Sequence, residues 1–314
     1  MKTKLKTASA VGALLAALSL SPQAQAVDTL VQFSTTGTGT GVDDGALGNY
    51  DITGINEFDW QSSGDLLISD NLSGTGSFAD GVLVDSLAIW AATAVVGDTV
   101  TFDIAAQARL NDMLDALGNS VAPATLDTNG TVDGDAGFEI TATLTGTESA
   151  TLIAPGILQF NTISGTYSFF YDESPDSVVE TGAGFTDGTD FLSGSLLSVN
   201  GTFQFGAGGN NNLVNSVDAY LSSFIQSDPQ SLQPLSGTTF DTLVSLVSLN
   251  EASADDLGDT VAGRVVVAGD LVRKADANSE FSATPVPEPG TLILLGSGLL
   301  GLAGLRRRAT ARVA

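Results

Sequence analysis

Apolar and polar residues alternate with a period of two through much of the chain. From position 100 to 109 the even positions carry Val, Phe, Ile and Ala, whereas most odd positions carry Thr, Asp, Gln or Arg. This alternation, enriched in Thr, Val and Phe, is typical of half-buried antiparallel strands. The same pattern predicts strands over 138–145, 163–171 and 199–205, with further strands over 29–35, 82–90, 214–225 and 261–271.

Clusters of Gly, Asp and Asn separate the predicted strands. Asp133-Gly134, Asp187-Gly188 and the segment 206–212 are examples, and all three have the residue types of turns. Outside the two chain ends, the segments 110–117 and 240–249 are the best helical candidates. Many short strands joined by Gly-rich turns predict an all-β fold, an antiparallel β-sandwich or a jelly-roll-like domain.

The first 26 residues have the pattern of a secretory signal peptide. Three lysines within the first six residues precede an apolar stretch over 8–20, and Ala24 and Ala26 form an A-x-A cleavage pattern. We therefore expect cleavage after Ala26 and export of the rest of the chain. The exported part then consists of an acidic β-rich domain over 27–275 and a polar linker over 276–285.

The chain ends in a short rigid motif over 286–291, which begins with Val286, Pro287, Glu288 and Pro289. Each proline has a fixed φ and lacks an N–H group, and it pushes the preceding residue towards extended geometry. The motif is therefore expected to be an extended segment that a peptidase can reach.

An apolar segment over 292–305 comes directly after the motif and predicts one short C-terminal transmembrane helix. Its length of roughly 22 Å is below the hydrocarbon thickness of roughly 30 Å, so flanking side chains would have to snorkel. Arg306, Arg307 and Arg308 come next, and the positive-inside rule places them in the cytoplasm. A buried core helix and a tail anchor that is never processed are the alternatives.

The exported part is strongly acidic. It holds 35 of the 36 acidic residues and four basic ones, which gives a formal charge of −31 against −25 for the whole chain. Such a surface disfavours nucleic acid as a partner and repels anionic polysaccharide at low salt. It would tolerate or recruit divalent cations, although solubility alone also accounts for the charge.

The chain contains neither Cys nor His, which removes much chemistry. Disulfides, Ser-His-Asp triads, thiol nucleophiles and His- or Cys-ligated metals are excluded. A glycoside hydrolase needs only two carboxylates, and Glu57 and Asp59 beside Trp60 are the first cluster to consider. Strand alternation instead predicts Phe58 and Trp60 inside and both acids outside. We expect no catalytic residue and no enzymatic activity.

One loop has the ligand chemistry of a calcium site. Asp127, Asn129, Asp133 and Asp135 lie close together with two glycines, and Ca²⁺ prefers such oxygen ligands. The spacing does not fit an EF-hand, and the same residue types are common in turns. Calcium is thus the one cofactor that the sequence suggests.

The tail, from Val286-Pro287-Glu288-Pro289 to the arginine cluster, resembles the PEP-CTERM sorting signal of Gram-negative bacteria that make exopolysaccharide. The resemblance implies processing near Pro-Glu-Pro by an exosortase, a membrane cysteine peptidase, and then release or transfer to the cell surface. Phe58-Asp59-Trp60 and the segment 184–189 are similar to the flocculation-associated group of these proteins. In that group a Pro-Gly-Asn-like turn tends to come after the tryptophan, whereas Gln61-Ser62-Ser63-Gly64 comes after it here.

These features together predict a protein that is exported through the inner membrane, held there transiently, and then placed at the cell surface or in the extracellular matrix. Its expected partners are an exosortase-type peptidase and exopolysaccharide, and its expected role is support of biofilm or floc formation. The alternatives are a carbohydrate-binding module and a carboxylate-based glycoside hydrolase acting on secreted polysaccharide.

Overall fold

A computed structural model of the chain describes residues 30–39, 50–69, 73–74, 87–128, 137–179, 181–228, 235, 238–246, 250–251 and 256–282. These residues fall within one compact unit, Asp28–Ala283. Strands dominate the described residues, which contain one α-helix, α2 (Leu87–Thr93). The all-β antiparallel class predicted from the alternation is confirmed.

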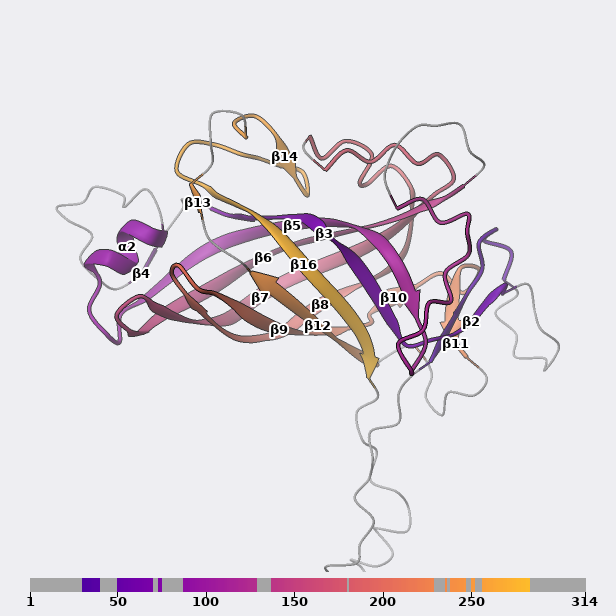
Figure 1. Cartoon of the computed structure of the whole chain (residues 1–314), viewed down its shortest axis with the longest axis horizontal. Helices are drawn as coiled ribbons and strands as arrows, with labels where there is room; N and C mark the ends of the chain where they lie inside the picture. The colour runs from indigo at the N-terminus through magenta and orange to yellow at the C-terminus, as the bar shows by residue number, and fades with distance from the viewer. Residues whose placement is uncertain are drawn as a thin grey trace, which may run out of the picture. The chain divides into compact units, whose positions relative to one another are not determined.

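Eight long strands form one sheet that closes on itself (Figure 1). Each strand pairs antiparallel with its two neighbours, and β9 completes the ring by pairing with both β8 and β12. The order around the ring is β3-β5-β6-β7-β8-β9-β12-β16 and back to β3. The strands are β3 (Glu57–Ile68), β5 (Thr99–Leu114), β6 (Glu139–Ala154), β7 (Ile157–Asp172), β8 (Thr189–Gln204), β9 (Gly208–Ser216), β12 (Thr239–Leu246) and β16 (Leu271–Ser282).

Two hydrophobic clusters fill the two ends of the ring. At one end, the small sheet β11-β1-β2 packs against ring aromatics such as Phe58 and Phe169. At the other end, α2 inserts the fully buried Trp90 beside Phe102 and Phe160. The two caps lie at opposite sides of Figure 1. The strands of the small sheet are β1 (Val31–Phe33), β2 (Ile52–Ile55) and β11 (Ile225–Ser227).

Loops also cover part of the outer face of the ring. The hairpin β14 (Thr260–Val261) and β15 (Arg264–Val265) packs on β3 and β5 through Val261. A second covering segment, residues 173–188, hydrogen-bonds to side chains of β5 and β6. Arg109, Gln107 and Glu139 are therefore buried, although alternation puts them on the outer face. The remaining short strands are β4 (Ser73–Gly74), β10 (Ala219–Tyr220) and β13 (Asn250–Glu251).

Both helices predicted within the domain are wrong. The segment 110–117 is mostly the end of β5, and 240–249 contains most of β12. Trp60 pairs with Leu110 whereas Asp59 pairs with Asp112, so Asn111 is an extra, bulged residue. The bulge lets Leu110 and Met113 both point inward, and this spacing of three resembles a helical pattern.

Further segments differ from the sequence prediction. The segment 261–271, expected to be one strand, contains the end of β14, β15 and turns instead. Leu87 to Trp90, expected to end a strand, begin α2, where the buried residues Leu87, Trp90 and Ala91 have helical spacing. Residues 276–282, expected to be linker, form the second half of β16. Among the described residues, no helix is both long and apolar enough to cross a membrane. The predicted transmembrane segment, 292–305, lies outside the described residues.

Candidate functional sites

Most of the sorting and metal residues predicted from sequence lie outside the described residues. These are Ala24 and Ala26, Val286 to Pro289, Arg306 to Arg308, and Asn129, Asp133 and Asp135 of the calcium loop. Asp127 is described, and its backbone N–H donates to the carbonyl oxygen of Phe138 at 2.8 Å. The signal cleavage site and the calcium loop stay predictions.

The acidic cluster around Trp60 does not have the geometry of a sugar site. Trp60 is 3% exposed, faces the interior of the ring, and donates from Nε1 to Ser279 Oγ at 2.9 Å. Glu57 and Asp59 are half-buried on the outer face. Partial burial, together with the charges of Glu280 and Asp59, raises the pKa of Glu57. The indole ring is therefore on the opposite side of the strand from both acids and cannot form a stacking platform beside them.

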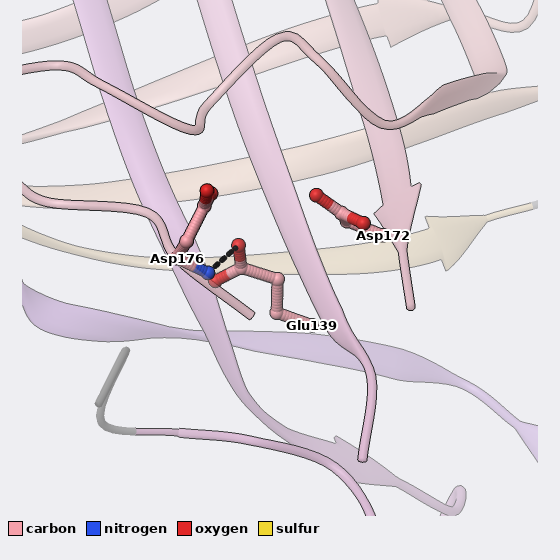
Figure 2. Close-up of side chains that lie close together, drawn as sticks. All are labelled: Glu139, Asp172 and Asp176. Carbon is pink, nitrogen blue, oxygen red and sulfur yellow. Dashed lines mark hydrogen bonds between the residues drawn. The ribbon is translucent and has the colours of Figure 1, made fainter. Parts of the chain in front are cut away.

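A different acidic cluster, Glu139, Asp172 and Asp176, has carboxylate oxygens within 4.8 Å of one another. Glu139 comes from β6, Asp172 ends β7, and Asp176 lies in the covering segment 173–188. Figure 2 shows the carboxylates of Asp172 and Asp176 on either side of Glu139. The strand pairing Glu139↔Asp172 brings the first two together.

Glu139 is fully buried, and its carboxylate is occupied by protein donors. Oε1 accepts from the backbone N–H groups of Asp176 and Ser177, each at 3.0 Å. Oε2 accepts from Arg109 Nε at 3.2 Å and from the Ser177 hydroxyl. Burial raises the pKa of Glu139, and these four donors oppose the rise. Glu139 thus holds the covering segment onto the ring.

The cluster offers few free ligands for a cation. Ca²⁺ takes about six to eight oxygens, whereas both Glu139 oxygens already accept hydrogen bonds and Asp172 Oδ1 accepts from Ser174 N at 2.8 Å. Partial burial, together with the charges of Asp187 and Asp172, raises the pKa of Asp176. The geometry fits a structural clamp better than a preformed cation site. Sequence alternation missed this cluster because it assigned Glu139 and Arg109 to solvent.

Uncharged polar side chains line the open part of the outer face in two neighbouring rows, which we call the polar rows. Strand register places these residues side by side across β6 to β9, at the inter-strand spacing of about 4.8 Å. Asn161, Asn200 and Asn212 are exposed. The first row is Thr151, Gln159, Thr202 and Asn210, and the second is Ser149, Asn161, Asn200 and Asn212.

The polar rows contrast with the rest of this acidic protein because they contain no ionisable group. Each amide offers a donor and an acceptor, and each hydroxyl can do both. A regular array of such groups on a firm sheet suits an extended, hydroxyl-rich chain. These features define a class: a closed antiparallel ring with a neutral, hydrogen-bonding patch on its outer face.

A comparison with known protein families finds a match in the C-terminal tail. Residues 285–308 match the PEP-CTERM protein-sorting motif, as the resemblance implied. The chain therefore carries a PEP-CTERM sorting motif, and this motif indicates exosortase-dependent sorting of an exported protein. No curated protein and no solved structure matches the chain.

Proposed function

We propose that this protein is a non-enzymatic component of the cell surface or extracellular matrix that supports biofilm or floc cohesion by binding exopolysaccharide. The sorting motif at 285–308 carries the first half of the proposal, because it assigns the chain to an export and sorting route. The polar rows support the second half, because they offer a neutral hydrogen-bonding surface on a rigid sheet.

Charge also favours a neutral glycan over an acidic one as the direct ligand. The exported part has a formal charge of −31, so an anionic chain would be repelled unless divalent cations bridged the two. The polar rows need no such bridge. A hydrolase is disfavoured because the Trp60 ring is buried away from Glu57 and Asp59.

The processing half is tested by the C-terminus of the mature protein. Mass spectrometry of protein from the surface or medium should find a chain that ends near Pro287 to Pro289. A double variant, Pro287→Ala with Pro289→Ala, should accumulate unprocessed at the inner membrane. Wild-type protein that keeps Arg306 to Arg308 at the cell surface would contradict this route.

The binding half is tested by removing amides from the second polar row. The triple variant Asn161→Ala, Asn200→Ala and Asn212→Ala should lose most co-sedimentation with purified exopolysaccharide, and it should fail to restore flocs in a deletion strain. A matched control replaces Ser174, Thr186 and Ser222, exposed polar residues outside the rows, by Ala.

Three outcomes separate the candidate functions. Binding that persists in the polar-row variant would refute the proposed surface. Floc loss on deletion without any glycan binding would leave a structural role only. Turnover of the polysaccharide by wild-type protein, abolished by Glu57→Gln, would instead support the hydrolase.

A further inference from the structure

A cavity of about 120 Å³ lies inside the ring, between the two hydrophobic clusters. Seven of the eight ring strands contribute to its lining, and β8 is the exception. Several inward-facing residues, among them Ala106, Ala277 and Val244, are only partly buried. Ala277 and Val244 pack against the two hydrophobic clusters on one side and line the cavity on the other.

The cavity exists because four adjacent strands present small residues at the same level. Gly64 on β3, Ala106 and Ala108 on β5, Ala142 on β6 and Ala277 on β16 leave the middle of the ring unfilled. Aromatic rings dominate the levels above and below, where Phe58, Phe102 and others pack closely. Because protein interiors are normally packed to crystal-like density, such a void is a specific feature of this sequence.

Polar groups are built into the wall. Trp60 Nε1 donates to Ser279 Oγ at 2.9 Å, Ser279 and Thr242 hydroxyls lie 2.9 Å apart, and Asn215 Nδ2 donates to Thr242 Oγ1 at 3.1 Å. This chain of hydrogen bonds crosses four strands. It ends at Asn215 Oδ1, a buried acceptor that has no hydrogen-bond partner among the described residues.

Two more polar groups of the lining lack partners. Asn211 Oδ1 is buried without a hydrogen bond in the described part of the chain. Glu148 on β6 is 7% exposed, and among the described residues no hydrogen bond or ion pair reaches its carboxyl group. Burial raises the pKa of Glu148 to about 8, so the group is largely neutral at pH 7.

Unsatisfied buried polar groups are costly, typically by about 1–3 kcal/mol each. A purely structural interior could carry Leu or Ala at these positions without that cost. A buried carboxyl group without a described partner, that of Glu148, instead lies in the wall of a void with an otherwise mostly apolar lining. An apolar cavity with a precisely placed polar group is typical of a small-molecule site.

We propose that the interior of the ring binds a small, uncharged molecule with an apolar body and one O–H or N–H donor. The apolar body would occupy the space beside Ala106 and Ala277. The donor would hydrogen-bond to the carboxyl group of Glu148. An engineered cavity of about 150 Å³ holds benzene, so 120 Å³ limits the ligand to roughly one six-membered ring or a short-chain alcohol. This site is independent of the polar rows and of the sorting signal.

The test uses phenol and benzene as matched probes with the exported protein purified from the surface fraction. Calorimetry and ligand-observed NMR should detect saturable binding of phenol. Benzene, which lacks the donor, should bind at least tenfold more weakly, because it leaves the carboxyl group of Glu148 without a hydrogen-bond partner. Equal binding of the two probes would overturn the proposed recognition.

Two substitutions in the lining of the cavity test whether phenol binds there. Ala277→Leu should fill the void and abolish phenol binding, whereas Ala207→Leu, in the exposed turn between β8 and β9, should leave it unchanged. Glu148→Leu should weaken phenol at least tenfold relative to benzene. Unchanged phenol affinity in both cavity variants would refute the site.

A measurement on wild-type protein covers the case in which the variants do not fold. A crystal structure with phenol should show the ring inside the cavity, with its hydroxyl within hydrogen-bond distance of the Glu148 carboxyl group. Ordered water alone at saturating phenol, or phenol bound only on the outer surface, would contradict the proposal.

Discussion

At the scale of single residues, burial decides the role of the charged side chains. Glu139 and Glu148 are both buried on β6, but they face opposite sides of the strand. Glu139 points outward into four donors, whereas Glu148 points inward into the cavity and has no described partner. The first therefore holds the covering segment through its hydrogen bonds, and the second is held neutral.

Glu148 predicts a pH dependence of stability. Its folded-state pKa is about 8 against an ordinary value of 4.5. Between these values the unfolded chain is ionised and the folded chain binds a proton, so stability falls as pH rises and levels off above about pH 8. Each pH unit in this window costs at most about 1.4 kcal/mol.

Urea denaturation of wild type and Glu148→Gln between pH 5 and pH 9 measures this effect. The variant should gain stability relative to wild type as pH rises. Glu173→Gln, at an exposed acid in the covering segment, serves as the control and should show no such trend. A Glu148→Gln difference that is constant across the range would disprove the prediction.

The Arg109–Glu139 pair predicts a strong effect of removing one partner. Both side chains are at most 4% exposed, so Arg109→Met leaves a buried acid with one cation removed. Loss of one partner of a buried pair costs about 3–5 kcal/mol. Chemical denaturation should therefore show a large loss for Arg109→Met and a partial recovery for Arg109→Met with Glu139→Gln. A loss below about 1 kcal/mol in the single variant would show that the pair is not needed.

At the scale of elements, local alternation was a good guide to strands and a poor guide to their ends. The segments 100–109, 138–145 and 199–205 are strands with the predicted inward faces. The pattern failed at Asn111, where a bulge exchanges the inward and outward positions of the residues after it. It also failed in β12, where the exposed Leu243 gave the apolar residues a spacing like that of a helix. Bulges and single exposed apolar residues depend on tertiary contacts, so a local pattern cannot reveal them.

The candidate sites could be predicted only in part for the same reason. The alternation along β6 places Glu148 on the same face as Ala150 and Leu152, so its inward position could be predicted from the sequence. Its lack of a hydrogen-bond partner could not be predicted, because that depends on side chains from other strands. The burial of Arg109 and Gln107 results from covering loops more than 60 residues away in sequence, such as Val179, which accepts from Gln107 Nε2 at 3.0 Å.

The seam between β8 and β9 predicts sensitivity at Gly194. A Cβ added there would lie 1.8 Å from the carbonyl oxygen of Ser216, which also accepts the Tyr167 hydroxyl at 2.8 Å. Gly194→Ala must therefore displace backbone, at a cost of about 1–3 kcal/mol.

Hydrogen exchange should show loss of protection in β8 and the end of β9 for Gly194→Ala. Ser198→Ala, at an exposed position on β8, should leave protection unchanged. Equal protection in wild type and Gly194→Ala would mean that the seam tolerates a side chain.

At the scale of the whole molecule, negative charge dominates. The described residues contain three salt bridges, far too few to balance the 35 acids of the exported part. Self-repulsion should therefore reduce stability at low salt, where the Debye length is about 30 Å at 0.01 M.

Thermal unfolding should report this repulsion. The melting temperature of the exported protein should rise between 10 mM and 1 M NaCl, and choline chloride should have a similar effect if screening is the cause. A further rise with millimolar CaCl₂ at constant ionic strength would support the calcium prediction, and the variant Asp133→Asn with Asp135→Asn would locate it. A melting temperature that falls with salt would contradict the repulsion argument.

The closing strand of the ring has a consequence for the order of events during export. β16 ends at Ser282 and pairs with β3, which begins at Glu57, so the ring closes between segments more than 200 positions apart. Residues 283 and 284 alone separate β16 from the sorting motif. In a chain that crosses the membrane from its N-terminus, the last strand of the ring crosses just ahead of the sorting motif, so the ring closes late in export. If the sorting signal retains the chain at the membrane, as the sequence predicts, the domain has time to close before release, and the peptidase acts on a finished fold.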